Sequence, residues 1–160
     1  MNPVRDEIFW GVTDLSHLIV LIVRLTIAAL LGGLIGLERQ EEGKAAGIRT
    51  HMLVAIGAAL FVLAPVLAGI EPSQTVRVIQ GIAAGVGFVG AGVILKLKAE
   101  QRVRGLTTAA SIWLTASVGV AVGLGALWAA VFVVGLAWLI LFVLGKVEKK
   151  AGGDRQPPTA

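Results

Sequence analysis

Residues 105–145 read GLTTAASIWLTASVGVAVGLGALWAAVFVVGLAWLILFVLG and contain no charged side chain. At about 1.5 Å of rise per residue, a helical stretch of this length would cross a membrane core of about 30 Å twice. The rest of the 160-residue chain is similar, with 56% hydrophobic and 15% charged residues overall and a mean hydropathy of +0.87. These values exclude a soluble enzyme and predict an integral membrane protein.

Apolar windows long enough to span a bilayer occur five times along the chain. The expected spans are residues 18–37, 52–70, 78–97, 106–125 and 126–145. We therefore predict an all-α integral membrane fold, a bundle of five transmembrane helices. A short tail over 1–17 precedes this membrane domain of 18–145, and a basic, disordered tail over 146–160 follows it, with no soluble domain expected there.

The basic residues are distributed unequally between the two sets of loops. Three lie in the first loop, four in the third loop and four in the C-terminal tail, which places eleven of the fourteen on one side. Only Arg5 and Arg77 lie on the other side, and Arg24 lies inside the first span. The positive-inside rule then predicts an extracytoplasmic N-terminus and a cytoplasmic C-terminus. The pI near 10 is explained by this topology, so no nucleic-acid partner is expected.

A shift of 58 residues aligns the first half of the chain with the second. The aligned pairs are Gly32 with Gly90, Gly47 with Gly105, Ile48 with Leu106, and Thr50 with Thr108. Each half is then a helix, a basic loop and a second helix. One interpretation is two parallel helical-hairpin repeats plus a fifth helix, and the other is shared membrane composition.

Glycine pairs with Gly-x-x-x-Gly spacing occur in three of the predicted spans. They are Gly32 with Gly36, Gly81 with Gly85, and Gly119 with Gly123. Such faces let membrane helices approach closely, so tight bundling is the expected use, and an interrupted third helix is the alternative. The third-span glycines are expected to pack against other helices of the same protomer. The first or the last pair is then left for a homodimer contact.

Arg24 is a default functional candidate because it is charged and lies about six residues inside the first span. We expect its guanidinium to be held inward, by Gln80, by Thr or Ser hydroxyls, or by carbonyls freed by the third-span glycines, and snorkelling is the alternative. Arg77 and Gln80 begin the third span at the same level. They could join Arg24 in an electropositive vestibule, or Arg77 could simply anchor its helix.

The other end of the bundle carries Glu38 and several bases. Adjacent side chains point about 100° apart on a helix, so Glu38 and Arg39 are not expected to pair along one helix face. We nevertheless expect a charge-assisted contact between Glu38 and one or more of Arg39, Arg49 and Arg104, acting as a clamp between loops. His51 has no second ligand nearby in the sequence, so no metal site is expected.

Three hydroxyl side chains, Thr107, Ser111 and Thr115, share one face of the fourth span, with Thr108 beside them. Packing against a neighbouring helix is the expected use, and a solute path is the alternative. No Asp or Glu lies in any predicted span, which is unfavourable for a cation carrier. The chain also shows no catalytic triad or paired carboxylates, so neither an enzyme nor a cofactor is expected.

Four strings in this sequence resemble motifs of the MgtC/SapB family of bacterial inner-membrane proteins. They are GGLIGLERQ (32–40), AGIRTHMLVAIGA (46–58), GVGFVGAGVI (85–94) and VRGLTTAASIWLTASVG (103–119). The resemblance covers about residues 20–145. The positions that match family motif residues are Glu38, Arg39, Arg49, Thr50, His51, Arg77, Gly90, Gly92, Arg104, Gly105, Thr107, Thr108, Ser111 and Trp113.

The resemblance implies a plasma-membrane protein linked to growth at low magnesium and, in pathogens, to survival in macrophages and inhibition of the F-type ATP synthase. This chain departs from longer members because it lacks their cytosolic domain and an Asp just before Arg77. The glycine faces, the lack of Asp and Glu in the predicted spans and the lack of a predicted soluble domain lead us to expect a non-enzymatic regulator or stress protein. It would act by helix contacts, with itself as a homodimer or with another membrane complex. A small channel or carrier for an ion or solute is the alternative.

Overall fold

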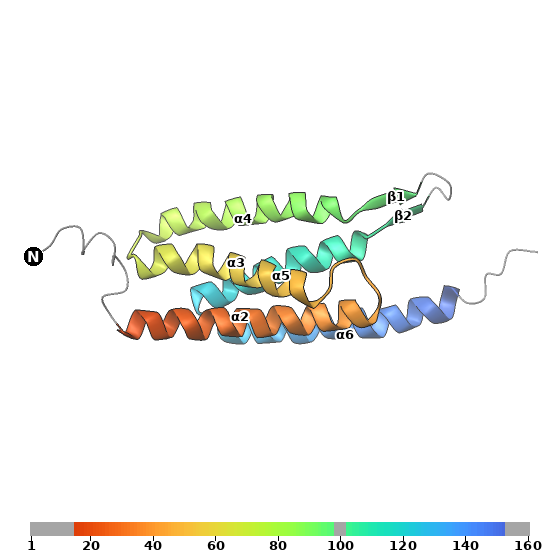
Figure 1. Ribbon diagram of the computed structural model, residues 1–160, viewed down its shortest axis with the longest axis horizontal. Coiled ribbons are helices and arrows are strands. Elements are labelled where there is room, and N and C mark those ends of the chain that lie inside the picture. The colour runs from red at the N-terminus through yellow and green to blue at the C-terminus, as the bar shows by residue number, and fades with distance from the viewer. Residues whose placement is uncertain (1–14, 98–101, 153–160) are drawn as a thin grey trace, which may run out of the picture.

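A computed structural model describes residues 15–97 and 102–152 of the chain. Its helices are α2 (Leu15–Glu41), α3 (Ile48–Leu67), α4 (Pro72–Gly92), α5 (Leu106–Leu124) and α6 (Leu127–Gly152). Each is long and apolar enough to cross a membrane, and together they form an elongated bundle (Figure 1). The predicted fold class is therefore confirmed.

The predicted bounds of the third span are wrong at both ends. Pro72 lies in the first turn of α4, where its missing N–H costs nothing, so the helix begins six residues before the expected start. After Gly92 the chain forms a short antiparallel ribbon of β1 (Leu95–Leu97) and β2 (Arg102–Arg104). Residues 95–97 are therefore a strand. Glycine at 90 and 92 and β-branched residues at 93 and 94 weaken the helix there.

The predicted disorder of the C-terminal tail is wrong for residues 146–152, because α6 continues through them. Residues 146–151 are mostly good helix formers, and Gly and Pro are concentrated only beyond them. The ends of the two predicted tails, 1–14 and 153–160, lie outside the described residues.

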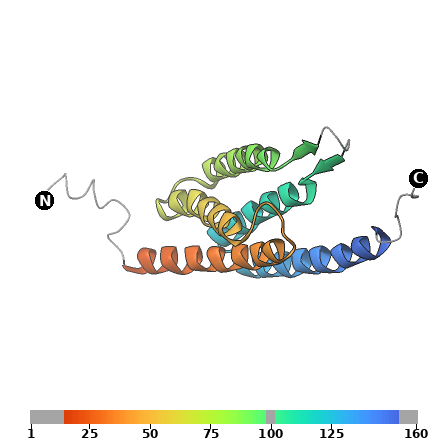
Figure 2. The ribbon, with the colours of Figure 1, turned by 45° about the vertical axis from the view of Figure 1, so that its right-hand side comes forward.

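The helices are arranged in three layers, with α3 and α5 in the middle, α2 and α6 on one side and α4 on the other (Figures 1 and 2). The core between α2, α3, α5 and α6 is built largely from small side chains, and it comprises Ala28, Leu31, Ile35, Ala55, Ala59, Val118, Val122, Ala130 and Val134. By contrast, α4 buries only Thr75 and Gly90 among its described residues. Helices α2, α3, α5 and α6 therefore form a packed core from which α4 stands apart.

The repeat predicted from the 58-residue shift has a counterpart in the helix contacts. A Cβ placed on Gly32 of α2 would meet His51 of α3, and one placed on Gly90 of α4 would meet Ala109 of α5. These two contacts are themselves related by the 58-residue shift. Gly47 and Gly105, also an aligned pair, are the N-caps of α3 and α5. The two halves therefore share one glycine contact and one helix-capping position, and a true internal repeat stays a prediction.

The two ends of the bundle differ in their loops. One end holds the α2–α3 loop, the β1–β2 ribbon and the C-terminal part of α6, and we call it the basic end (Figure 1). The opposite end holds the start of α2 and the α3–α4 and α5–α6 turns. Gly105 sets the approach of α4 to α5 at the basic end. Its φ is +93° and a Cβ there would lie 2.1 Å from the Val93 carbonyl oxygen, so only glycine fits.

Candidate functional site

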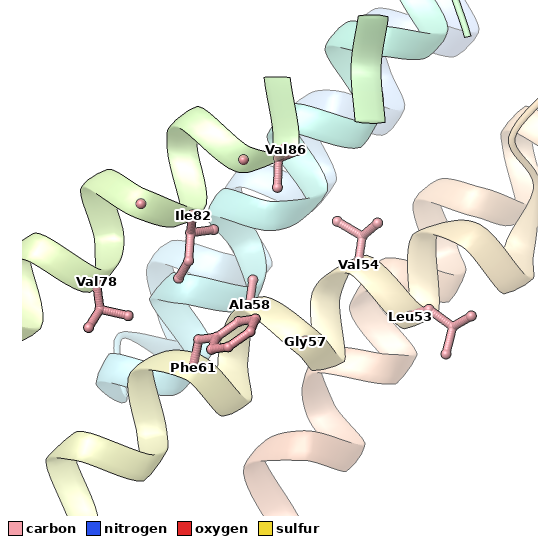
Figure 3. A pocket seen from close by; sticks show the side chains of 10 residues that line it. Leu53, Val54, Gly57, Ala58, Phe61, Val78, Ile82 and Val86 are labelled. Carbon is pink, nitrogen blue, oxygen red and sulfur yellow. The ribbon is translucent and has the colours of Figure 1, made fainter. Parts of the chain in front are cut away.

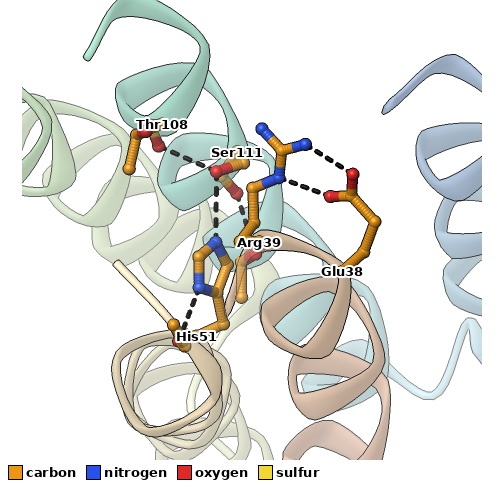
Figure 4. Close-up of polar contacts among 7 residues, drawn as sticks. Glu38, Arg39, His51, Thr108 and Ser111 are labelled. Carbon is orange, nitrogen blue, oxygen red and sulfur yellow. Dashed lines mark hydrogen bonds and ion pairs between the residues drawn. The ribbon is translucent and has the colours of Figure 1, made fainter. Parts of the chain in front are cut away.

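A cluster of buried polar side chains lies at the basic end, between the last turns of α2 and the first turns of α3 and α5. We call it the basic-end cluster, and it comprises Glu38, Arg39, His51, Thr108 and Ser111 (Figure 4). Polar groups inside a membrane bundle must find partners in the protein. All of the fully buried polar side-chain atoms in the described residues do so.

Glu38 and Arg39 form a two-pronged ion pair within α2. The Arg39 Nε and Nη2 atoms donate to Glu38 Oε2 and Oε1 at 2.5 and 2.6 Å. The two residues are only 5% and 3% exposed. The expectation that these neighbours would not pair is therefore wrong, because two long side chains can bend around the helix surface to meet when both are buried. The predicted contact between Glu38 and a base is present.

Glu38 does not form the predicted clamp between loops within the described residues. Its ion-pair partner is the adjacent residue, Arg39. Arg49 is exposed and forms no ion pair within the described residues, and Thr50 is half-buried beside it. Arg104 is also exposed, although it does interact elsewhere in the protein. The pair consequently stabilises one helix end rather than joining two loops.

His51 joins α3 to α5 through one hydrogen bond and contacts the N-cap of its own helix through another. Its Nδ1 lies 2.9 Å from the Gly47 carbonyl oxygen, which can only accept, so Nδ1 carries a proton. Its Nε2 lies 3.1 Å from Ser111 Oγ, which in turn lies 2.8 Å from the Thr108 carbonyl oxygen. The single Ser111 proton can serve only one of these two acceptors.

The hydroxyl face of α5 is divided by the structure. Thr115 donates to the Ser111 carbonyl oxygen at 2.8 Å, and both residues are buried against neighbouring helices, as packing predicts. Thr107 is exposed at the start of the helix. The motif residue Trp113 is 52% exposed and faces the α4 side of α5, where it borders a small apolar pocket.

Arg24 is held inward at the opposite end of the bundle. Its Nη1 donates to the Gly123 carbonyl oxygen at 2.8 Å, and its guanidinium packs against Gly125 in the turn between α5 and α6. The carbonyls of the last turn of a helix have no partner within that helix, and they form the negative end of its dipole. Arg24 therefore caps α5. The partner is a backbone carbonyl, although it belongs to α5 and not to the third span as expected.

The predicted vestibule of three polar residues is not formed. Arg77 and Gln80 are exposed on α4, which lies across the middle layer from α2 and Arg24 (Figure 2). A role for Arg77 as an anchor of its own helix stays a prediction. Gln80 is not the partner of Arg24.

The assignment of the glycine faces is reversed by the structure. Cβ atoms on Gly32 and Gly36 would lie 2.7 Å from backbone atoms of α3, and those on Gly119 and Gly123 would lie 2.3 and 2.8 Å from α3 carbonyl oxygens. These two pairs therefore pack against α3 inside the protomer. On α4, Cβ atoms on Gly81, Gly85 and Gly92 would meet nothing within 4 Å. The expected roles failed because spacing alone does not say which neighbour a face meets. The helix α4 is also uninterrupted.

An apolar groove runs between α3 and α4. It holds two adjoining cavities of about 430 and 720 Å³, which share Gly57, Phe61 and Val78. In Figure 3, Val78, Ile82 and Val86 point from α4 toward α3 across this space. Sequence reasoning missed the groove. The only signal was the run of small residues in α4, which was assigned to close packing.

The described residues contain no group of three His, Cys, Asp or Glu side chains that could hold a metal ion. The basic-end cluster offers one imidazole and one carboxylate, and the carboxylate is neutralised by Arg39. The arrangement can hold helix ends in register and present α4 to other molecules.

The sequence of this chain matches a known protein family and several curated proteins. A model of the MgtC family matches residues 25–150. Protein SrpB of Synechococcus elongatus is 50% identical over 116 residues, covering 66% of this chain and 63% of SrpB. Escherichia coli K12 YhiD, named "Putative magnesium transporter YhiD", is 46% identical over 114 residues, covering 65% of this chain and 51% of YhiD.

Protein MgtC of Salmonella typhimurium is 47% identical over 104 residues, covering 65% of this chain and 43% of MgtC. The chain thus spans about half the length of the curated relatives it matches. No solved structure matches it. The match to the family model over most of its length shows that this chain belongs to the MgtC family.

Proposed function

We propose that this chain is a non-enzymatic protein of the bacterial inner membrane that is linked to magnesium homeostasis and acts through helix contacts. The observation that carries the proposal is the exposure of α4. This helix is apolar enough to span the membrane, yet little of it is buried, and four of its five glycines face open space. Open glycines on a membrane helix are the feature that lets a second helix approach closely.

The α4 face that is available for such a contact can be defined. Gly81, Gly85, Phe88 and Gly92 follow one another at spacings of four, three and four residues, so they lie on one side of the helix. Phe88 is 84% exposed at the middle of this stripe. Gly81 and Gly85 also border the groove against α3. A helix of a second copy or of another membrane protein could therefore pack along this face, which we call the α4 face.

The link to magnesium is supported by relatives. YhiD carries magnesium transport in its name, and the family resemblance implies growth at low magnesium. A regulator or stress protein fits the α4 face because a regulator needs a docking surface and no catalytic group. The partner is a second copy of this chain, as a homodimer, or another membrane complex, for which the family resemblance implies the F-type ATP synthase.

The orientation belongs to the same proposal. Within the described residues, nine of the basic residues belong to the segments at the basic end, which favours its location in the cytoplasm. The N-terminus is then extracytoplasmic. Green fluorescent protein fused after residue 160 should fluoresce in intact cells, and loss of fluorescence with an active periplasmic reporter at that position would reverse the orientation.

A small channel or carrier is the second candidate, and the name of YhiD favours it. The described interior does not offer a polar path from end to end, because small apolar side chains fill the core between Arg24 and the basic-end cluster. Flux assays in liposomes distinguish the candidates. Selective magnesium flux through the purified chain would establish the carrier and overturn the regulator.

Crosslinking tests the proposed contacts directly, since the chain has no native Cys. Phe88→Cys places a thiol on the α4 face, and Trp128→Cys places one at a matched, 88% exposed position on α6. In oxidised membranes we expect Phe88→Cys to form a disulfide-linked dimer. With a bifunctional reagent that couples its thiol to an amine of a neighbouring protein, we expect a larger adduct. No adduct, or equal adducts from both variants, would contradict the proposal.

A further inference from the structure

A cavity of about 340 Å³ at the basic end has both a polar and an apolar wall. The polar residues that line it are Arg39, Glu42, Lys44 and Thr107, and the apolar wall is the end of α6, with Ile140, Leu141, Leu144 and Gly145. We call it the interfacial cavity. It is separate from the α3–α4 groove and from the hydrogen bonds of His51.

The position of the interfacial cavity coincides with the boundary of the apolar bundle. Thr107 is the second residue of α5, and Gly145 is the last residue of the apolar part of α6. Charged residues follow directly after Gly145 in the sequence. In a bilayer, acyl chains meet phosphate headgroups at this level. The apolar wall of the cavity therefore matches an acyl chain, and the polar wall matches a headgroup.

The polar wall offers donors suited to a phosphate group. Glu38 holds the Nε and Nη2 atoms of Arg39 (Figure 4), which fixes the guanidinium and leaves Nη1 without a hydrogen bond among the described residues. Every fully buried polar side-chain atom of the described residues has a hydrogen-bond partner. Nη1 has none, so it is not fully buried. Lys44 is exposed beside it, and α5 begins without a side-chain cap at Thr107. An anchored guanidinium, an ammonium and a helix N-terminus are all attractive to phosphate.

The apolar wall favours a lipid phosphate over a soluble one. Ile140 and Leu144 are 46% and 53% exposed and line the same cavity, so a small soluble anion would leave them without a partner. An acyl chain lying along α6 would cover them. Glu42 in the same lining limits the net positive charge, which disfavours a highly charged soluble ligand. We propose that the interfacial cavity binds the phosphodiester headgroup of a membrane phospholipid, with one acyl chain along the end of α6.

The test measures lipid binding by the purified full chain in detergent, using native mass spectrometry. Phosphatidylglycerol is the lipid probe, diacylglycerol lacks its phosphate, and glycerol 3-phosphate lacks its acyl chains. We expect phosphatidylglycerol to bind at least about tenfold more tightly than either partial ligand. Equal binding of diacylglycerol would show an acyl-chain site only, and equal binding of glycerol phosphate a soluble-phosphate site, and either result would overturn the proposal.

Two matched pairs of variants locate the binding. Gly145→Leu should fill the cavity without disturbing the fold, because a Cβ there meets nothing within 4 Å, and Gly135→Leu is the equivalent change elsewhere on α6. Lys44→Ala removes a lining charge, and Arg49→Ala removes an exposed charge outside the lining. We expect weaker phosphatidylglycerol binding by about tenfold for Gly145→Leu and about fivefold for Lys44→Ala, with both controls unchanged. Unchanged binding by Gly145→Leu, or equal losses in Lys44→Ala and Arg49→Ala, would overturn the proposal.

Discussion

Glu38 and Arg39 show how burial changes the behaviour of a sequence-adjacent pair. On an exposed helix their side chains would point apart, and an exposed pair would contribute only about 0–1 kcal/mol. Here both are almost fully buried, so each charge requires the other. The identity of the partners was predictable from the sequence, but their burial was not, because it depends on how α5 and α6 cover the end of α2.

Removing one member of this pair should destabilise the bundle strongly. Glu38→Ala leaves the Arg39 guanidinium buried without a counter-charge, and we expect a loss of about 3–5 kcal/mol in the free energy of unfolding. Unfolding of the purified chain by SDS titration measures this loss. The double variant Glu38→Leu, Arg39→Met removes both charges and should recover most of the stability. A single variant as stable as the parent chain would contradict the buried-pair description.

Arg24 should stabilise the end of the bundle opposite the basic end through its hydrogen bond to the Gly123 carbonyl oxygen. Arg24→Leu removes a charged hydrogen bond, and we expect a loss of about 1.5–3 kcal/mol. Arg24→Lys should recover little, since an ammonium lacks the planar fork of the guanidinium. The control is Arg77→Leu, which changes an exposed Arg and should have little effect in the same unfolding titration. Equal stability of Arg24→Leu and the parent chain would indicate that the charge is dispensable there.

At the scale of helices, the same glycine spacing has two different uses. Gly119 of α5 lies so close to α3 that its Cβ would be 2.3 Å from the Ala55 carbonyl oxygen, whereas Gly85 of α4 faces open space. Hydropathy was sufficient to predict five helices, because each span must be apolar along its length. The role of each glycine pair was not predictable, since it depends on which helices become neighbours in the bundle.

This difference predicts opposite effects of one added methyl group. Gly119→Ala should separate α5 from α3 and cost about 1–3 kcal/mol, because a backbone carbonyl cannot move aside easily. Gly85→Ala should leave the stability of the protomer unchanged or slightly raised. Thermal unfolding of both variants in the same detergent provides the comparison. Equal losses in the two variants would mean that α4 is as tightly packed as α5.

At the scale of the whole molecule, the chain combines a tightly packed core with one helix held at its margin. The core is made of α2, α3, α5 and α6, and charged or polar residues fasten it at both ends. The two helices of the first hairpin repeat thus both contribute to the core, while the first helix of the second repeat, α4, keeps most of its surface open. Internal repetition suggested the two hairpins, but it could not show that equivalent helices have unequal burial.

The central claim is that the protein acts through the α4 face, and growth at limiting magnesium tests it most directly. The assay uses a bacterium that lacks its own MgtC-family gene and carries this chain, with Gly85→Ile compared with the matched Gly135→Ile on α6, where a Cβ also meets nothing within 4 Å. With equal amounts of both variants in the membrane, we predict that Gly85→Ile abolishes rescue of growth and that Gly135→Ile retains it. Full rescue by Gly85→Ile would contradict the claim.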